Sequence, residues 1–397
     1  MQRKVAAAVS IPITKPVFGD EERLAVQRPL ETGWVVQGPF VREFEEMFGS
    51  FTGAQFCIAT SSCTTALHVA VAAMGLRAGD EVIVPAFTWV STANIVECMG
   101  ARPVFCDIDL RTFNIDPGRI EGCITPRTVG IIPVHLFGLC ADMDAILDIG
   151  RRRGLWVIED AACGLGGSYR GRHAGTMGVA GCFSFHPRKS ITTGEGGMIT
   201  TGHEDVARFA VSVRDHGASR SDLTRHGSRG AFLLAEYDTL GYNYRMTDIQ
   251  GALGCAQMKR LDEILAARRR IAARYDTLLS EFDAISTPPV PDGLVHGYQA
   301  YVCLFGGDAA SLATVDRLHD RRNDVMARLE EQGIATRQGT HAPVLLGYYA
   351  SKYGLRAQDF PNAYLADRLS LTLPLYPQLT PSEQSLVCER LVEAVDG

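Results

Sequence analysis

The feature that most constrains the fold is a regular alternation of short apolar runs with helix-like stretches between about residues 50 and 200. The apolar runs are rich in Val, Ile, Phe and Cys with little polar alternation, as strands covered on both faces must be. This alternation predicts an α/β fold with a mostly parallel sheet between layers of helices. The predicted strands are Gln55–Ala59, Glu81–Pro85, Pro103–Asp107, Val129–Val134, Trp156–Glu159 and Cys182–Phe185.

The character of the sequence changes after about residue 250. Ala252–Leu279 has the pattern of a long helix rich in Ala, Arg and Leu, and a short strand is predicted over Ala300–Phe305. Two further helical patterns follow before the chain ends. We therefore expect a large α/β domain over residues 1–255 and a small C-terminal α+β domain over residues 256–397.

Composition narrows the class of protein. Of the 397 residues 46% are hydrophobic and 21% are charged, which is typical of a soluble globular protein. The formal net charge of −6 disfavours a nucleic-acid-binding surface, so no nucleic-acid partner is expected. No window approaches the roughly 18 uninterrupted apolar residues of a membrane span, and the first 16 residues are expected to form a loose tail rather than a signal peptide.

The cysteines indicate a reducing environment. Eleven of them are spread singly from Cys57 to Cys388, and no C-x-x-C pair occurs. Neither a zinc site nor a thioredoxin motif is therefore predicted, and no other metal site is expected. Single cysteines inside apolar runs behave as small hydrophobic residues, which is consistent with a cytoplasmic protein.

The first of three unusual strand ends is Thr60-Ser61-Ser62-Cys63-Thr64-Thr65, which precedes a helical pattern. Ligands gather at the carboxyl ends of parallel strands. One helix cap would explain one or two of these residues, but the whole run exceeds what a cap requires. Free N–H groups at a helix start, with hydroxyls beside them, bind phosphate. Because no G-x-G-x-x-G or G-x-x-x-x-G-K-[ST] motif is present, a dinucleotide or nucleoside triphosphate is not indicated.

The second and third strand ends carry an acid and a lysine. Glu159 and Asp160 end a buried strand, where Asp160 either caps a helix or places its carboxylate in the ligand crevice. Lys189 follows the strand that ends at Phe185 and precedes the turn glycines of residues 194–197. Most lysines are simply exposed, but a lysine held in a cleft loses its charge more readily and becomes a nucleophile toward carbonyls.

Pyridoxal phosphate requires three groups that these strand ends supply: a phosphate cradle, which is the run Thr60–Thr65, a carboxylate and an amine. Its aldehyde needs a lysine, its pyridine nitrogen needs an acid, and its phosphate needs a donor-rich helix start. Trp89 either stacks on the cofactor ring or is a partly buried core residue. The sequence thus predicts a pyridoxal 5'-phosphate site built around Lys189 and Asp160.

These residues resemble the DegT/DnrJ-type sugar aminotransferases, which are fold type I pyridoxal-phosphate enzymes. The resemblance runs from Ile11 to about Val392, and a series of motifs in this order is highly specific. The motifs are Gly33-Trp34 with Gln37-Gly38-Pro39, Gly79-Asp80-Glu81-Val82, Glu159-Asp160-Ala161-Ala162, Phe183-Ser184-Phe185 with Lys189, Thr193-Gly194-Glu195-Gly196-Gly197, Gly241-Tyr242-Asn243-Tyr244-Arg245-Met246 and Leu373-Pro374-Leu375-Tyr376-Pro377.

The resemblance implies a role for each site residue. Lys189 would form the Schiff base with the cofactor and carry a proton, Asp160 would pair with the pyridinium, and Trp89 would cover the ring. The resemblance also implies a homodimer with shared active sites, in which Asn243 reaches the phosphate of the neighbouring subunit; the sequence alone fits a turn residue there equally well. The residues that it assigns to the phosphate within one chain are Thr64, Thr65 and Ser184.

Two positions depart from the family pattern. Cys63 replaces the usual glycine of the phosphate cradle, where only a backbone N–H is needed, and Cys163 replaces a Gln or His that touches the ring hydroxyl, so a weaker partner is expected there. On the substrate side the candidates are His341, which lies where the resemblance places the acceptor, and His186, which lies near a strand end. Histidines at such positions are more often structural.

The function that follows is transamination, implied by the resemblance to use glutamate as the donor and a keto group of a nucleotide-linked deoxysugar as the acceptor. Three alternatives remain open at this point. They are an aminocyclitol aminotransferase, a pyridoxal-phosphate sugar dehydratase and a non-catalytic cofactor-binding regulatory protein. Lys189 disfavours the family's dehydratase branch, in which histidine replaces it, and the complete Lys189–Asp160 pair disfavours a regulatory protein.

Overall fold

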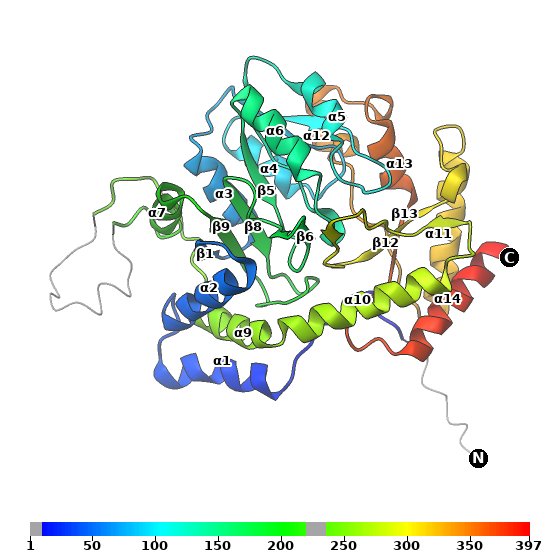
Figure 1. Cartoon of the computed structure of the whole chain (residues 1–397), viewed down its shortest axis with the longest axis horizontal. Helices are drawn as coiled ribbons and strands as arrows, with labels where there is room; N and C mark the ends of the chain where they lie inside the picture. Colours follow the sequence, from blue (N-terminus) through cyan, green and yellow to red (C-terminus); the bar gives the residue numbers. More distant parts are fainter. Residues whose placement is uncertain (1–9, 220–235) are drawn as a thin grey trace.

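The computed structural model describes residues 10–219 and 236–397, so most of the predicted N-terminal tail lies outside the described residues. Its centre is a seven-stranded sheet with the order β1-β9-β8-β5-β4-β2-β3 (Figure 1). The strands are β1 (Phe56–Thr60), β2 (Glu81–Pro85), β3 (Arg102–Cys106), β4 (Thr128–Ile131), β5 (Trp156–Asp160), β8 (Ala180–Ser184) and β9 (Gly197–Thr201).

The sheet is mostly parallel, as the alternating sequence pattern predicts. β2 pairs in parallel with β3 and β4, and β5 pairs in parallel with β4 and β8. β9 is the exception, because it runs antiparallel to both β1 and β8. β8 and β9 are therefore joined across one end of the sheet, and the connection that carries Lys189 lies at the carboxyl end of β8.

Both faces of the sheet are covered, which explains the continuous apolar runs. Successive side chains of a strand point to opposite faces. In β2, Val82 and Val84 join the core cluster that contains Ala66 and Leu67 of α3, whereas Ile83 joins the cluster that contains Ile146 of α6. α3 and α6 therefore cover opposite faces.

The helices agree with the predicted ones where the apolar pattern is strong. The predicted long helix is divided at Arg260 into α9 and α10, and α1 and α2, which pack against α9, were not predicted. The helices are α1 (Asp20–Thr32), α2 (Pro39–Thr52), α3 (Cys63–Ala73), α4 (Ser91–Cys98), α5 (Pro117–Ile120), α6 (Met143–Arg153), α7 (Glu204–Val213), α9 (Asp248–Lys259), α10 (Leu261–Leu278), α11 (Val315–Glu331), α12 (Gly347–Tyr353), α13 (Pro361–Leu369) and α14 (Pro381–Asp396). In this described part of the chain, no helix combines the length and the apolar character that crossing a membrane requires.

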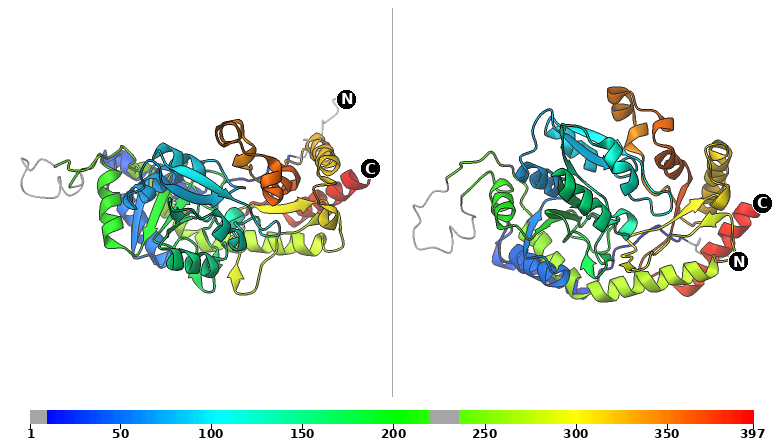
Figure 2. Two further views of the ribbon diagram at one scale, coloured as in Figure 1. Left: turned by 90° about the horizontal axis from the view of Figure 1, so that it is seen from above. Right: turned by 45° about the horizontal axis from the view of Figure 1, so that its top comes forward.

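The C-terminal part has its own small antiparallel sheet, in the order β10-β12-β13. Its strands are β10 (Ile285–Ser286), β12 (Tyr301–Phe305) and β13 (Ser370–Leu373). α10 extends from the large sheet toward α14 and joins the two parts (Figures 1 and 2). A border after residue 255 would fall inside α9, so the two-domain division remains a proposal. Three short strands form a further sheet: β6 (Ser168–Tyr169), β7 (Arg172–His173) and β11 (Leu294–Val295).

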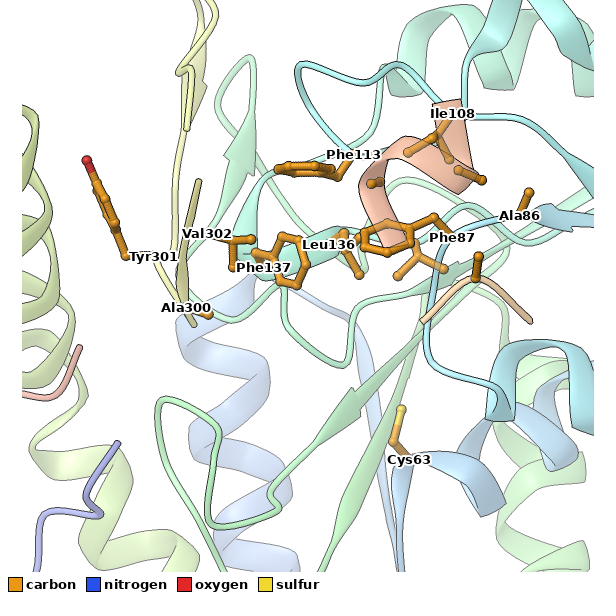
Figure 3. Packing of buried hydrophobic residues seen from close by; sticks show 14 of the residues in the cluster. Cys63, Ala86, Phe87, Ile108, Phe113, Leu136, Phe137, Ala300, Tyr301 and Val302 are labelled. Carbon is orange, nitrogen blue, oxygen red and sulfur yellow. The ribbon is translucent and has the colours of Figure 1, made fainter. Parts of the chain in front are cut away.

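One apolar core connects the large sheet with the C-terminal sheet. Figure 3 shows Phe137 next to Val302 of β12 and the preceding Ala300, with Phe87 farther along the same cluster beyond Leu136. The rings of Phe113 and Phe137 lie 5.7 Å apart edge to face. Both residues have a left-handed backbone, with φ of 61° and 57°, a conformation that costs free energy in any residue except glycine. The packing of these rings holds the strained backbone in place.

A buried arginine links this junction to the Lys189 loop. Arg268 is 1% exposed, and its guanidinium donates hydrogen bonds to the carbonyls of Tyr298 at 3.1 Å and Gln299 at 3.2 Å. Burial lowers the pKa of Arg268 to about 10. The Gln299 side-chain amide in turn donates to the carbonyl of Arg188 at 2.9 Å. The C-terminal half of the chain therefore positions the residue next to Lys189.

Candidate active site

Lys189 lies in the loop between β8 and β9, as the sequence predicts. Its Nζ donates a hydrogen bond to Cys163 Sγ at 3.0 Å. Burial opposes the charge of Lys189, but Cys163, Cys63 and Asp160 outweigh this effect and raise its pKa. The surroundings of Lys189 therefore favour its ammonium form in the cofactor-free protein. Lys189 must give up a proton before it attacks a carbonyl.

Asp160 lies at the carboxyl end of β5 and is 3% exposed. Its Oδ2 accepts a hydrogen bond from the hydroxyl of Thr92 at 2.7 Å, and its Oδ1 accepts one from the Ala162 N–H at 3.1 Å. Burial nevertheless raises the pKa of Asp160, because these donors and the positive charge of Lys189 offset only part of the desolvation. No helix follows Asp160, so it caps a turn rather than a helix. Sequence reasoning missed Thr92, which carries no motif.

Glu159 is a structural residue whose side chain is buried in the fold and does not face the crevice. Adjacent strand residues point to opposite faces, and the Glu159 carboxylate lies fully buried against His135 Nε2 at 2.7 Å. Burial would raise the pKa of Glu159, but the bonds from His135 and from backbone N–H groups keep it low. The N–H donors belong to Gly175, Met177 and Gly178. His135, which is 0% exposed, is therefore a buried structural residue.

The phosphate cradle predicted after β1 forms the start of α3. The Ser62 side chain accepts a hydrogen bond from the Thr65 N–H, and the Thr65 hydroxyl accepts one from the Ser62 N–H. In the described residues, the N–H groups of Cys63 and Thr64 have no hydrogen-bond acceptor. Two free N–H groups at the positive end of a helix fit a phosphate.

Gly197 determines how closely β9 approaches this cradle. A Cβ atom at position 197 would lie 2.4 Å from the carbonyl carbon of Ser62 and 2.6 Å from the nitrogen of Cys63, which are distances that real atoms do not adopt. The glycine is required for space rather than for an unusual backbone angle. Sequence reasoning assigned it to a tight turn, and only the contact shows its role.

Cys63 fits the cradle without strain. It is the first residue of α3, it is absent from the residues with positive φ, and its Sγ donates to the carbonyl of Cys182 at 3.4 Å. Its side chain points into the core, so its backbone N–H stays available at the helix start. Cys163 is the other residue that differs from the family pattern. Its Sγ accepts the hydrogen bond from Lys189 Nζ.

Trp89 and His341 lie together at the end of the connection that follows β2. Trp89 is 59% exposed, and its ring centroid is 6.1 Å from that of His341. The His341 carbonyl accepts a hydrogen bond from the Thr88 N–H at 3.0 Å. The C-terminal half of the chain therefore contacts the connection that carries Trp89.

Three other predicted residues lie around these groups. The Ser184 hydroxyl accepts a weak bond from the His186 N–H at 3.4 Å, and His186 Nδ1 accepts one from the Arg188 N–H at 3.2 Å. Burial lowers the pKa of His186. Asn243 is exposed and pairs through its backbone with Asp215, while the next carbonyl, of Tyr244, accepts the Ser61 N–H at 2.8 Å. The predicted roles of these residues remain proposals.

The residues present fit pyridoxal phosphate on chemical grounds. One site combines two free N–H groups at a helix start, a buried carboxylate with a raised pKa and an amine in reach of that carboxylate's charge. Asp160 would hold the pyridine nitrogen, α3 would hold the phosphate and Lys189 would hold the aldehyde. The fold and this site define a pyridoxal-phosphate-dependent aminotransferase of fold type I.

Comparison with known proteins agrees with this class. Residues 16–392 match the model of the DegT/DnrJ/EryC1/StrS aminotransferase family, and the chain belongs to this family. It is 38% identical over 387 residues to the spore coat polysaccharide biosynthesis protein SpsC of Bacillus subtilis, covering 98% of this chain and 97% of SpsC. The chain is therefore a member of the sugar aminotransferases, as the resemblance in its sequence indicated.

Solved structures have the same fold over nearly the whole chain. The putative sugar aminotransferase Spr1654 from Streptococcus pneumoniae, in its PMP form, superposes with a TM-score of 0.89 at 27% identity and covers 98% of this chain and 99% of its own. DesV from S. venezuelae, in complex with a ketimine intermediate, superposes with a TM-score of 0.86 at 28% identity, with the same coverage.

The close approach at Gly197 gives the first prediction. In Gly197→Ala, the added methyl group must displace the Ser62–Cys63 backbone, so we expect a loss of about 1–3 kcal/mol in the free energy of unfolding and at least roughly tenfold weaker binding of pyridoxal phosphate. Urea unfolding and a fluorescence titration with the cofactor measure the two effects. The matched control is Gly202→Ala, where an added Cβ meets nothing within 4 Å and both quantities should stay unchanged. Normal cofactor binding by Gly197→Ala would contradict the proposed cradle.

The buried carboxylate gives the second prediction. Because the folded pKa of Asp160 is raised above its ordinary value of 3.8, its contribution to stability is present at lower pH and is lost as the pH rises through the folded pKa. In Asp160→Asn the buried side chain carries no charge at any pH, so the variant does not lose this stability as the pH rises. The cofactor-free variant should therefore melt at a higher temperature than the wild type at pH 8. The difference should shrink on acidification, and melting curves from pH 5 to pH 8 measure it. A variant that is less stable at pH 8 than at pH 5, relative to wild type, would show that Asp160 is not strained by burial.

Proposed function

We propose that this enzyme transfers an amino group from an amino acid, with glutamate as the expected donor, to a keto group of a nucleotide-linked deoxysugar. The observation that carries the proposal is the Lys189–Asp160 site within a chain of the sugar aminotransferase family. SpsC is named for polysaccharide biosynthesis, and Spr1654 is named as a putative sugar aminotransferase. Both names support an amino-sugar biosynthetic role.

In this proposal, bound pyridoxal phosphate supplies an electron-accepting ring that stabilises the negative charge left when a proton leaves the substrate carbon. Lys189 would accept that proton and release it again, because its Nζ, which donates a hydrogen bond to Cys163 Sγ at 3.0 Å, is the amine of the site. Asp160, whose Oδ2 accepts a hydrogen bond from the Thr92 hydroxyl, would hold the protonated ring nitrogen. Trp89, with His341 beside it, covers the outer face of the site.

The location and the assembly are also proposals. We infer a cytoplasmic enzyme, because all eleven cysteines are free thiols in the structure. We infer a homodimer with shared sites, in which Asn243 reaches the cofactor phosphate of the neighbouring subunit. The exposure of Asn243, next to the Tyr244 carbonyl that contacts the Ser61 N–H of the cradle, supports a position near the phosphate sites.

The third prediction tests whether Lys189 forms the Schiff base with pyridoxal phosphate. Wild-type protein should turn yellow with pyridoxal phosphate, and borohydride should fix the cofactor to the peptide that contains Lys189, whereas Lys189→Ala should do neither. With glutamate, the wild type should aminate at least one member of a panel of nucleotide-linked keto-sugars. The panel includes inososes, and amination of an inosose alone would assign the enzyme to cyclitols. Water loss without consumption of glutamate would instead indicate a dehydratase.

The fourth prediction tests shared sites. Lys189→Ala and Asn243→Ala should each be nearly inactive as pure dimers. In a mixed dimer, one site carries both changes and the other carries neither, so random exchange of equal amounts should restore roughly a quarter of the wild-type activity. Light scattering verifies that the dimers have exchanged. No recovery in verified mixed dimers would show that Asn243 acts within its own subunit.

A further inference from the structure

Two buried glutamines hold the backbone on either side of Lys189. Gln257 of α9 is 1% exposed, and its Oε1 accepts a hydrogen bond from the Thr192 N–H at 3.3 Å. Gln299, which precedes β12, is 8% exposed and donates from its Nε2 to the Arg188 carbonyl at 2.9 Å. One glutamine therefore binds the chain just before Lys189, and the other binds it three residues later.

These two bonds fix a segment that is otherwise held only from within its own loop. Inside the β8–β9 loop, the Lys189 N–H donates to the His186 carbonyl at 2.8 Å, and the Thr192 hydroxyl donates to the Phe185 carbonyl at 2.7 Å. From outside that loop, the described residues offer the backbone of residues 188–192 no further hydrogen bond. Because a lysine side chain has a long flexible stem, the position of its amine depends on how firmly this backbone is held.

The orientation of the Gln257 amide follows from its other partners. Its Nε2 donates to the Glu22 carboxylate at 2.9 Å and to the Val17 carbonyl at 2.9 Å, and both of these groups can only accept. The amide nitrogen must face these two acceptors, so the amide oxygen faces the Thr192 N–H.

Glu22 of α1 is itself fixed as a buried carboxylate. It is 2% exposed, its Oε2 accepts a hydrogen bond from the Gly19 N–H at 2.6 Å, and Arg260 lies 3.5 Å from its Oε1. Burial would raise the pKa of Glu22, but the bonds from Gly19 and Gln257 and the charge of Arg260 keep it low. A charged acceptor strengthens the bond from Gln257, so α1 stabilises this glutamine in one orientation.

Gln299 is held by the helix that follows α9. The guanidinium of Arg268, in α10, donates to the Gln299 carbonyl at 3.2 Å. α9 and α10 are consecutive helices, and together they extend along one side of the molecule from α1 to α14 (Figure 1). The same pair of helices therefore supports both glutamines that bind the Lys189 segment.

We propose that Gln257 and Gln299 are positioning residues for Lys189, which hold its backbone so that its amine stays aligned for proton transfer to and from the substrate. This inference rests on the proposed aminotransferase function. A base must lie within hydrogen-bond reach of the proton that it removes. A displacement of about 1 Å costs on the order of 100-fold in rate, so two anchors on one short segment have a direct effect on the reaction.

A buried glutamine elsewhere in the chain separates positioning from ordinary stabilisation. Gln384 of α14 is 1% exposed and donates from its Nε2 to the Ile271 carbonyl of α10 at 2.6 Å. It thus has the same residue type, burial and kind of acceptor as Gln299, but its bond does not involve the β8–β9 loop. Gln384→Met is therefore the matched control for Gln257→Met and Gln299→Met.

The fifth prediction concerns the half-reaction with glutamate in these methionine variants, whose side chains have a similar length but no amide. In single turnovers followed by absorbance, the rate constant should fall by roughly 10- to 100-fold in Gln257→Met and Gln299→Met. The apparent dissociation constant for glutamate should stay within about twofold, because the change acts on the proton-transferring amine. Glutamate deuterated at its α-carbon should give an isotope effect at least as large as that of the wild type.

Hydrogen exchange of the cofactor-free protein measures the anchoring without any turnover. In Gln257→Met, the Thr192 amide loses its acceptor and should exchange roughly threefold faster or more. The loop peptide of Gln299→Met should also exchange faster than that of the wild type. Gln384→Met should lower the free energy of unfolding but keep the wild-type rate constant, isotope effect and loop exchange.

The outcomes distinguish this inference from the proposed function. If the wild type consumes glutamate and both loop variants do so at the wild-type rate, the inference is wrong and the aminotransferase function stands. An equal loss of rate in Gln384→Met, or an isotope effect smaller than that of the wild type, also overturns the inference. If the wild type reacts with no amino donor, the proposed function fails, and this inference fails with it. Pyridoxal phosphate uptake verifies that each variant is folded, and Gln299→Met alone decides the test if Gln257→Met does not fold.

Discussion

The site depends on keeping one carboxylate out of water at the end of a central strand. Asp160 is buried with only the Thr92 hydroxyl and the Ala162 N–H as donors, and its pKa rises as a result. The free energy that is lost by burying this carboxylate is offset by the dense packing of the rest of the core on both sides of the sheet. A buried acid of this kind stays poised for a positively charged partner, and a protonated pyridine ring is such a partner.

The neighbouring acid shows how one strand serves two purposes. Glu159 points to the opposite side of β5, where His135 and three backbone N–H groups satisfy it. It fixes the segment between β7 and β8, and it takes no part in the crevice. Two adjacent carboxylates therefore have opposite pKa shifts, because one has four donors and the other has two.

The C-terminal half of the chain completes a site that the large sheet begins. Arg268 holds the carbonyls of Tyr298 and Gln299, and Gln299 holds the carbonyl next to Lys189. The Lys189 loop thus contacts both parts of the molecule, which share one apolar core, so a movement between these parts would change the surroundings of Lys189 directly.

The sequence by itself determined the mostly parallel sheet, the pyridoxal-phosphate class and the positions of Lys189, Asp160 and the α3 cradle, because apolar runs and strand-end residues follow local rules. It did not determine the contacts that Thr92 and Gly197 make. Each of these contacts joins segments far apart in the chain: the Thr92 hydroxyl donates to Asp160, and Gly197, which lacks a Cβ, packs against Ser62. A local sequence pattern does not indicate which distant segments will meet, so only the tertiary packing of the whole chain decided these contacts.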